Sequence, residues 1–162
     1  MPFLTDEQLA VATAPENDRL LVTAGPGTGK THTLVERLVH LVEVRAVHPG
    51  SILVLSFSRA AVGELRRRLR ASDTEAAGII PVTFDSVATR LLANIDEDGQ
   101  WTEQSYDGRI AHAIDKIGEI GEFLESIDHV CVDELQDLVS VRMRFVQALL
   151  KTLNGGFTLL GD

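Results

Sequence analysis

The sequence has few cysteines and few large aromatic residues. Its 162 residues include one cysteine, one tryptophan and one tyrosine. Cys131 therefore has no partner for an internal disulfide, and its place within an apolar run predicts a small buried core residue. No apolar run approaches the roughly 18 residues of a membrane span, and the acidic N-terminus lacks a signal-peptide stretch. These absences argue against secreted and membrane-spanning proteins and favour a cytoplasmic one.

The charge balance limits any contact with nucleic acid to a local patch. The net charge is −9, so the surface as a whole repels phosphates. Five of the fifteen basic residues lie within a short segment, as Arg59, Arg66, Arg67, Arg68 and Arg70. This arginine cluster is either such a patch or the solvated face of a helix. The length and the 44% hydrophobic content suit one soluble globular domain.

Apolar runs alternate with helical patterns along the chain, which predicts an α/β fold with a mostly parallel sheet of about five strands flanked by helices. Strands are expected over residues 19–24, 51–57, 78–83, 128–132 and 157–160. Helices are expected over residues 5–13, 29–45, 58–71, 84–92, 108–124 and 139–150. The polar, acidic stretch 94–106 is expected to be a loop. Gln8 follows Thr5 by three residues, as in a capping box.

A glycine-rich loop lies between the first expected strand and the helix after it. Its residues are Ala24, Gly25, Pro26, Gly27, Thr28, Gly29, Lys30 and Thr31, and His32 follows. Glycines let backbone N–H groups turn toward a phosphate, and the start of the helix adds its partial positive charge. Lys30 can reach the β- and γ-phosphates, and the Thr31 hydroxyl can bind Mg²⁺. The segment from Ala24 to His32 is therefore the predicted binding site for a nucleoside triphosphate.

Two carboxylates, Asp133 and Glu134, follow the fourth expected strand. The carboxyl ends of parallel strands face the ligand crevice, so both are expected beside the glycine loop. Asp133 is then a ligand of Mg²⁺, and Glu134 is the general base that activates the attacking water. Without the glycine loop, the same pair would equally suit a helix N-terminus with an acidic first turn.

The motifs and their order along the chain resemble those of the UvrD/Rep branch of superfamily 1 helicases. The resemblance covers nearly the whole chain. The run Thr5-Asp-Glu-Gln-Leu is similar to the motif whose glutamine reads adenine, which implies that role for Gln8. The run Asp133-Glu-Leu-Gln-Asp137 is similar to the motif for magnesium and hydrolysis. Its glutamine implies that Gln136 couples the ATP site to DNA. The resemblance implies that the cofactors are ATP and Mg²⁺. It also implies that the fold is the three-layer, RecA-like fold of P-loop NTPases.

Two further segments resemble the family's contacts with single-stranded DNA. The run from Leu55 to Arg67 implies a ring contact by Phe57 and a phosphate or stacking contact by Arg59. Thr83 and Phe84 belong to a second such element. There, Asp85 stands where the family usually has a histidine. A carboxylate at this point argues against a phosphate contact.

The resemblance implies that residues 1–162 are the first RecA-like domain of a longer helicase. The second RecA-like domain, and the glutamine that usually follows the Gly-Asp pair at Gly161, are absent from this sequence. Residues 93–125 correspond to a much reduced DNA-binding insertion. The alternative is a nucleotide-dependent binding module without motor activity. An AAA-type ATPase or a P-loop kinase shares the glycine loop but does not account for Gln8 or Gln136.

Overall fold

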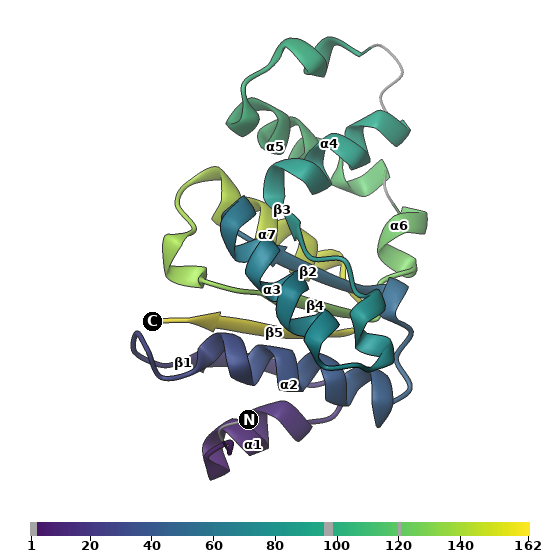
Figure 1. Ribbon diagram of the computed structural model, residues 1–162. Helices are drawn as coiled ribbons and strands as arrows, with labels where there is room; N and C mark the ends of the chain where they lie inside the picture. Colours follow the sequence, from purple (N-terminus) through teal and green to yellow (C-terminus); the bar gives the residue numbers. More distant parts are fainter. Residues whose placement is uncertain (1–2, 96–98, 120) are drawn as a thin grey trace.

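The computed structural model describes residues 3–95, 99–119 and 121–162, and its centre is a five-stranded parallel sheet (Figure 1). The strands are β1 (Arg19–Thr23), β2 (Ile52–Ser56), β3 (Val82–Thr83), β4 (His129–Val132) and β5 (Gly156–Gly161). Their order across the sheet is β1-β5-β4-β2-β3, and every neighbouring pair is parallel. The predicted α/β class is confirmed.

Helices cover both faces of this sheet. They are α1 (Asp6–Thr13), α2 (Lys30–Glu43), α3 (Arg59–Ala71), α4 (Phe84–Ile95), α5 (Tyr106–Asp115), α6 (Gly121–Glu125) and α7 (Val141–Thr152). Short 3₁₀ turns lie at Pro49–Ser51, Glu75–Gly78, Gln100–Glu103, Ile117–Glu119 and Leu135–Asp137. In the described part of the chain, no helix has the length and apolar character needed to cross a membrane.

Strand β2 shows why the sheet is buried on both sides. All five of its residues are buried, and its four apolar residues alternate between two core clusters. Leu53 and Leu55 pack in the cluster that contains residues of α4, α5 and α7, whereas Ile52 and Val54 pack in the cluster that contains residues of α2 and α3. A continuous apolar run is what a strand covered on both faces requires. Cys131 is fully buried, as predicted.

The region between β3 and β4 departs from the sequence prediction in three ways. Strand β3 has two residues rather than six, since a 3₁₀ turn occupies the start of the expected strand and Pro81 has no N–H to donate. The expected loop 94–106 contains the 3₁₀ turn Gln100–Glu103, with Trp101 8% exposed in the core, and its residues 96–98 lie outside the described part. The expected helix 108–124 is divided into α5, a 3₁₀ turn and α6, because Gly118 and Gly121 favour helix poorly.

Figure 1 shows α4 and α5 as a helical lobe beyond the β3 edge of the sheet. The two helices pack against each other, and α5 also contacts α7 on the sheet. The phenyl ring of Phe84, at the start of α4, meets that of Phe145 of α7 edge to face, with ring centres 6.4 Å apart. The lobe is therefore joined to the core through apolar contacts.

His129 ties three segments together at the start of β4. Its side chain is fully buried, with Nδ1 donating to the Glu16 carbonyl (2.7 Å) and Nε2 accepting from the Thr158 hydroxyl (3.0 Å). Its role is structural, because both ring nitrogens bond to groups of the protein itself. Burial lowers the pKa of His129 to about 4.

This lowered pKa predicts that His129 stays neutral under conditions that protonate an ordinary histidine. In an NMR titration, we expect its imidazole signals to remain those of the neutral ring down to about pH 5. The unfolded chain takes up the proton near pH 6.5. The stability that His129 contributes is therefore present above pH 6.5 and is lost as the pH falls toward 4, by up to about 3 kcal/mol. A midpoint near pH 6.5 in the folded protein would contradict this account.

Candidate nucleotide-binding site

The glycine loop joins the end of β1 to the start of α2. Gly27 and Gly29 have φ angles of 74° and 91°, which side-chain-bearing residues rarely adopt. Gly29 is the N-cap of α2, and no side chain caps the helix there. This 14-residue helix therefore begins at the loop without a side-chain cap, and its dipole favours an anion there.

The Lys30 ammonium lies within the loop. It donates to the carbonyls of Ala24 (2.8 Å) and Gly25 (3.2 Å), and it forms an ion pair with the Asp162 carboxylate. Its side chain is only 8% exposed. A phosphate entering the loop therefore has to replace Asp162 as the partner of Lys30.

A cavity of about 380 Å³ lies beside the loop and contains both Gln8 and Lys30 in its wall. The lining residues are Thr5, Glu7, Gln8, Val11, Val22, Thr23, Ala24, Thr28, Lys30 and Thr33. The Gln8 side chain donates to the Thr28 carbonyl (2.8 Å) and accepts from the Thr5 N–H (2.9 Å), which completes the predicted capping box. Gln8 thus links α1 to the glycine loop.

Sequence reasoning missed the apolar part of this wall. Val11 of α1 and Val22 of β1 line the cavity together with Gln8. A pocket with apolar walls and a few placed polar groups is typical of small-ligand sites. The two valines are far apart in sequence, so their convergence depends on how α1 packs.

Arg37 of α2 holds the chain that follows α1. Its side chain is fully buried and donates to the carbonyls of Ala14 and Pro15, the latter at 2.7 Å. Burial lowers the pKa of Arg37. No sequence pattern singled out this residue, which lies in a helix of otherwise ordinary composition.

The acidic pair lies at the carboxyl end of β4, but β4 is not the neighbour of β1. Strand β5 lies between them. Asp133 is 2% exposed and accepts from the Glu134 N–H (3.0 Å). Burial, together with the Glu134 charge, raises the pKa of Asp133 to about 6, and Lys30 partly offsets the shift. One intervening strand leaves about 10 Å between the two strand ends.

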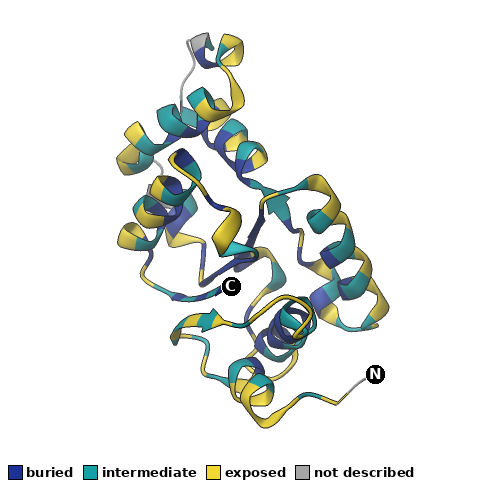
Figure 2. Ribbon diagram, turned by 90° about the vertical axis from the view of Figure 1, so that its left-hand side faces the viewer, coloured by how far each residue is buried: buried dark blue, intermediate teal, exposed yellow. Residues whose placement is uncertain are grey.

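Glu134 is held in an unusual backbone conformation. Its φ and ψ angles are 57° and 50°, in the left-handed region that non-glycine residues seldom adopt. The Gln136 side-chain amide donates to the Glu134 carboxylate (2.5 Å), and the Gln136 carbonyl oxygen accepts from the Asp162 N–H (3.1 Å). Gln136 therefore connects Glu134 to the end of β5, on the side of the molecule that faces the viewer in Figure 2.

The donor set suits Mg²⁺ rather than a metal held by protein alone. Thr31 is half-buried in the first turn of α2 and offers a hydroxyl, and Asp133 offers a carboxylate. In the described ranges, no three His, Cys, Asp or Glu residues gather as a metal cluster. Mg²⁺ commonly takes one or two protein oxygens and completes its shell with water and substrate phosphates. His32 instead lies 4.0 Å from the Glu36 carboxylate, one turn along α2.

The four predicted nucleic-acid residues line one cleft of about 270 Å³ at the carboxyl ends of β2 and β3. Phe57 is 44% exposed and Arg59 is exposed, whereas the Thr83 hydroxyl pairs with that of Ser86 (2.9 Å). Phe84 lines the cleft as well, but it is 1% exposed, so its ring is almost wholly covered by the protein. The Phe84 ring packs edge to face against Phe145 of α7, and this contact covers it.

Three members of the arginine cluster, Arg66, Arg67 and Arg68, have partners within the protein. Arg67 and Arg68 both pair with Glu64 on the same helix, at 2.7 and 2.6 Å. Arg66 donates to the Pro81 carbonyl (3.3 Å). These contacts favour a solvated helix face over a phosphate-binding patch for residues 66–68.

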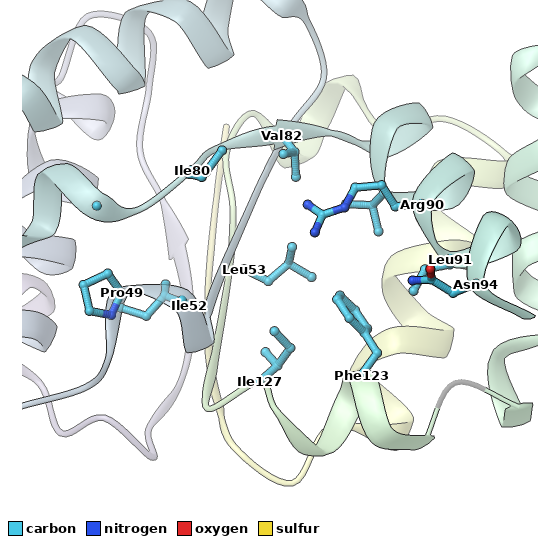
Figure 3. Close-up of a pocket in the computed structure, with 13 residues that line it drawn as sticks. Pro49, Ile52, Leu53, Ile80, Val82, Arg90, Leu91, Asn94, Phe123 and Ile127 are labelled. Carbon is cyan, nitrogen blue, oxygen red and sulfur yellow. The ribbon is translucent and has the colours of Figure 1, made fainter.

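A second cavity, of about 260 Å³, contains none of the predicted site residues. Figure 3 shows that Leu53, Val82, Phe123 and Ile127 border it, with Arg90 and Asn94 on α4. It lies beside the β3 edge and starts at the amino ends of β2 and β4, whereas the glycine loop is at the carboxyl end of β1. It is therefore separate from the nucleotide site.

Fold and site together define a P-loop domain of the RecA-like α/β type. Residues 4–116 match the family model of the UvrD/REP helicase N-terminal domain, and the chain belongs to that family. It is 30% identical over 156 residues to the ATP-dependent DNA helicase SRS2 of Saccharomyces cerevisiae, covering 94% of this chain and 13% of that protein.

Bacterial helicases give a similar result over shorter segments. The chain is 38% identical over 104 residues to DNA helicase II of Escherichia coli, covering 60% of this chain and 14% of that protein. It is 38% identical over 95 residues to the ATP-dependent DNA helicase UvrD2 of Mycobacterium tuberculosis, covering 55% and 13%. The chain thus spans about one seventh of the length of these relatives.

Proposed function

We propose that residues 1–162 form the ATP-binding domain of a DNA helicase, the first of two RecA-like domains. The complete protein would couple ATP hydrolysis to movement on single-stranded DNA. The observation that carries the proposal is that Gln8 and Lys30 line one cavity; in this proposal, the Gln8 amide reads adenine and the Lys30 ammonium binds phosphate. The ATP-dependent helicases among the relatives support the same reading.

In this proposal, different residues bind the phosphates, hold Mg²⁺ and activate the attacking water. The N–H groups from Gly25 to Lys30 cradle the phosphates, and the Lys30 ammonium neutralises their charge. Thr31 and Asp133 would hold Mg²⁺, which supplies further charge neutralisation at the phosphates when bound. Glu134 orients the attacking water and takes its proton.

Gln136 is the proposed link between the ATP site and DNA. Its side chain bonds to the Glu134 carboxylate and to the Asp162 backbone, so a movement of the Asp162 backbone alters how the general base Glu134 is held. Hydrolysis by residues 1–162 alone should be slow, because an arginine supplied by another domain typically contributes about 10³–10⁵ in rate. Residues 93–125 remain a reduced insertion in this proposal.

The role of Gln8 can be tested by nucleotide selectivity. We expect the wild-type chain to bind Mg·ATP more tightly than Mg·GTP, and Gln8→Ala to lose about tenfold in ATP affinity and most of this preference. Titration calorimetry with both nucleotides measures it. Thr5→Ala is the matched control, since it also breaks the capping box but keeps the amide. Equal selectivity in wild type and Gln8→Ala would reject the adenine-reading role.

One observation favours the alternative, a nucleotide-dependent binding module without motor activity. Asp85 lines the cleft where the helicase reading expects DNA, and its carboxylate opposes phosphates. Salt-sensitive binding of single-stranded DNA that is weakened by Arg59→Ala would support the helicase domain. Absence of binding at low salt would favour the module.

A further inference from the structure

The cleft at the carboxyl ends of β2 and β3 has a second wall that belongs to none of the motifs described above. Tyr106 of α5 and Arg142 of α7 line it opposite the predicted nucleic-acid residues. They are distant in sequence from Phe57, and α5 and α7 pack against each other beside the sheet. The cleft thus combines two exposed aromatic side chains with two arginines.

Tyr106 presents its ring from a fixed position. It is the first residue of α5, whose N-cap Ser105 accepts from the Gly108 N–H (3.1 Å). The Arg109 guanidinium lies 5.6 Å from the centre of the ring and donates to the Thr102 carbonyl (3.1 Å). Even so, Tyr106 is 60% exposed. A large aromatic ring that is anchored and still exposed is suited to stacking on a flat ligand.

Arg142 connects the two aromatic positions. Its guanidinium lies 5.5 Å from the centre of the Phe57 ring and 2.9 Å from the Asp107 carboxylate, next to Tyr106. Its side chain is 20% exposed, so much of its surface is committed to these contacts. Arg142 therefore fixes the spacing between Phe57 and the start of α5.

The lining of the cleft has mixed charge: Asp85 is negative, and of the two arginines Arg142 is already paired with Asp107. Asp85 lines the cleft with Tyr106, and a carboxylate repels phosphate but not a neutral base. Arg59 lines the cleft and is exposed, so its guanidinium can contact a phosphate of the same strand. Aromatic platforms flanked by cations are the usual way to hold unpaired bases without reading their sequence.

We propose that Tyr106 is a base-stacking residue of the single-stranded DNA site, a second stacking position beside Phe57, and that Arg142 positions the two rings. This inference rests on the proposed function, because it adds to the DNA surface of the same domain. It assigns a binding role to the reduced insertion, which supplies α5.

The test is binding of a fluorescein-labelled oligothymidylate to residues 1–162 at low salt, followed by anisotropy. We expect Tyr106→Ala to weaken binding about tenfold and Tyr106→Phe to retain it, since stacking is worth about that much per base. Ile80→Ala is the matched control: it removes an equally exposed apolar side chain (64%) outside the cleft. In Tyr106→Trp, we expect the added indole fluorescence to be quenched by the unlabelled oligonucleotide.

The outcomes separate this inference from the proposed function. If Phe57→Ala weakens binding while Tyr106→Ala matches the wild type and the Tyr106→Trp signal is unchanged, the inference fails and the proposed function stands. If the wild type does not bind at all, both fail. If Arg142→Ala reduces affinity and also removes the quenching in Tyr106→Trp, the positioning role is supported; unchanged quenching would overturn it.

Discussion

Replacing Lys30 with alanine is expected to lower the affinity for Mg·ATP by about 100-fold. The ammonium is the one described cation bonded within the glycine loop, and charged hydrogen bonds to phosphate oxygens contribute about 1.5–3 kcal/mol each. Calorimetric titration with Mg·ATP measures the loss. The wild-type chain should bind nucleotide in the same experiment and release phosphate only slowly.

Two controls make the Lys30 result specific. Lys151→Ala removes an exposed lysine at the end of α7 and should leave binding unchanged. Lys30→Arg keeps the positive charge but replaces a compact ammonium with a planar fork, so it should restore only part of the affinity. Rapid phosphate release by the wild-type chain, abolished in Lys30→Ala, would show that residues 1–162 need no second domain for turnover.

Replacing Arg37 with methionine is expected to lower the free energy of unfolding by about 3 kcal/mol. The substitution keeps a long side chain but removes the charged donor of the Ala14 and Pro15 carbonyls from a fully buried position. The melting temperature should fall by roughly 10 °C for a chain of this size. Urea unfolding followed by circular dichroism measures the change.

Arg45 provides the matched control for Arg37. It also donates to a carbonyl after α1, that of Thr13 at 3.2 Å, but its side chain is 36% exposed. Arg45→Met should cost less than about 1 kcal/mol, since water replaces the lost partner. If both variants unfold alike, the buried contact of Arg37 does not hold the segment between α1 and β1.

The sequence was sufficient to predict those structural features that depend on one short segment of the chain. The apolar run at residues 51–57 predicted a strand. The spacing of Thr5 and Gln8 predicted a capping box, and the glycines between Ala24 and Lys30 predicted a loop between a strand and a helix. Each of these depends on a few consecutive residues, so each could be read before the fold was known.

Features that depend on how distant segments meet could not be read in the same way. Nothing near Asp133 indicates that β5 enters the sheet between β4 and β1. Arg37 looks like a polar residue of a surface helix until its partners after α1 are known. Tyr106 and Phe57 are separated by two helices in sequence and share a cleft only because α5 packs on α7.

The path of the chain between Thr83 and His129 has a consequence for how such domains diversify. The chain leaves the sheet at its edge strand β3, forms the helical lobe, and returns into the interior strand β4. Material added within the lobe would extend away from the sheet and leave the strand order unchanged. Recombination or protein engineering can therefore exchange the lobe for a shorter or longer module. The glycine loop, the carboxylates after β4 and the hydrogen bonds between strands would be unchanged.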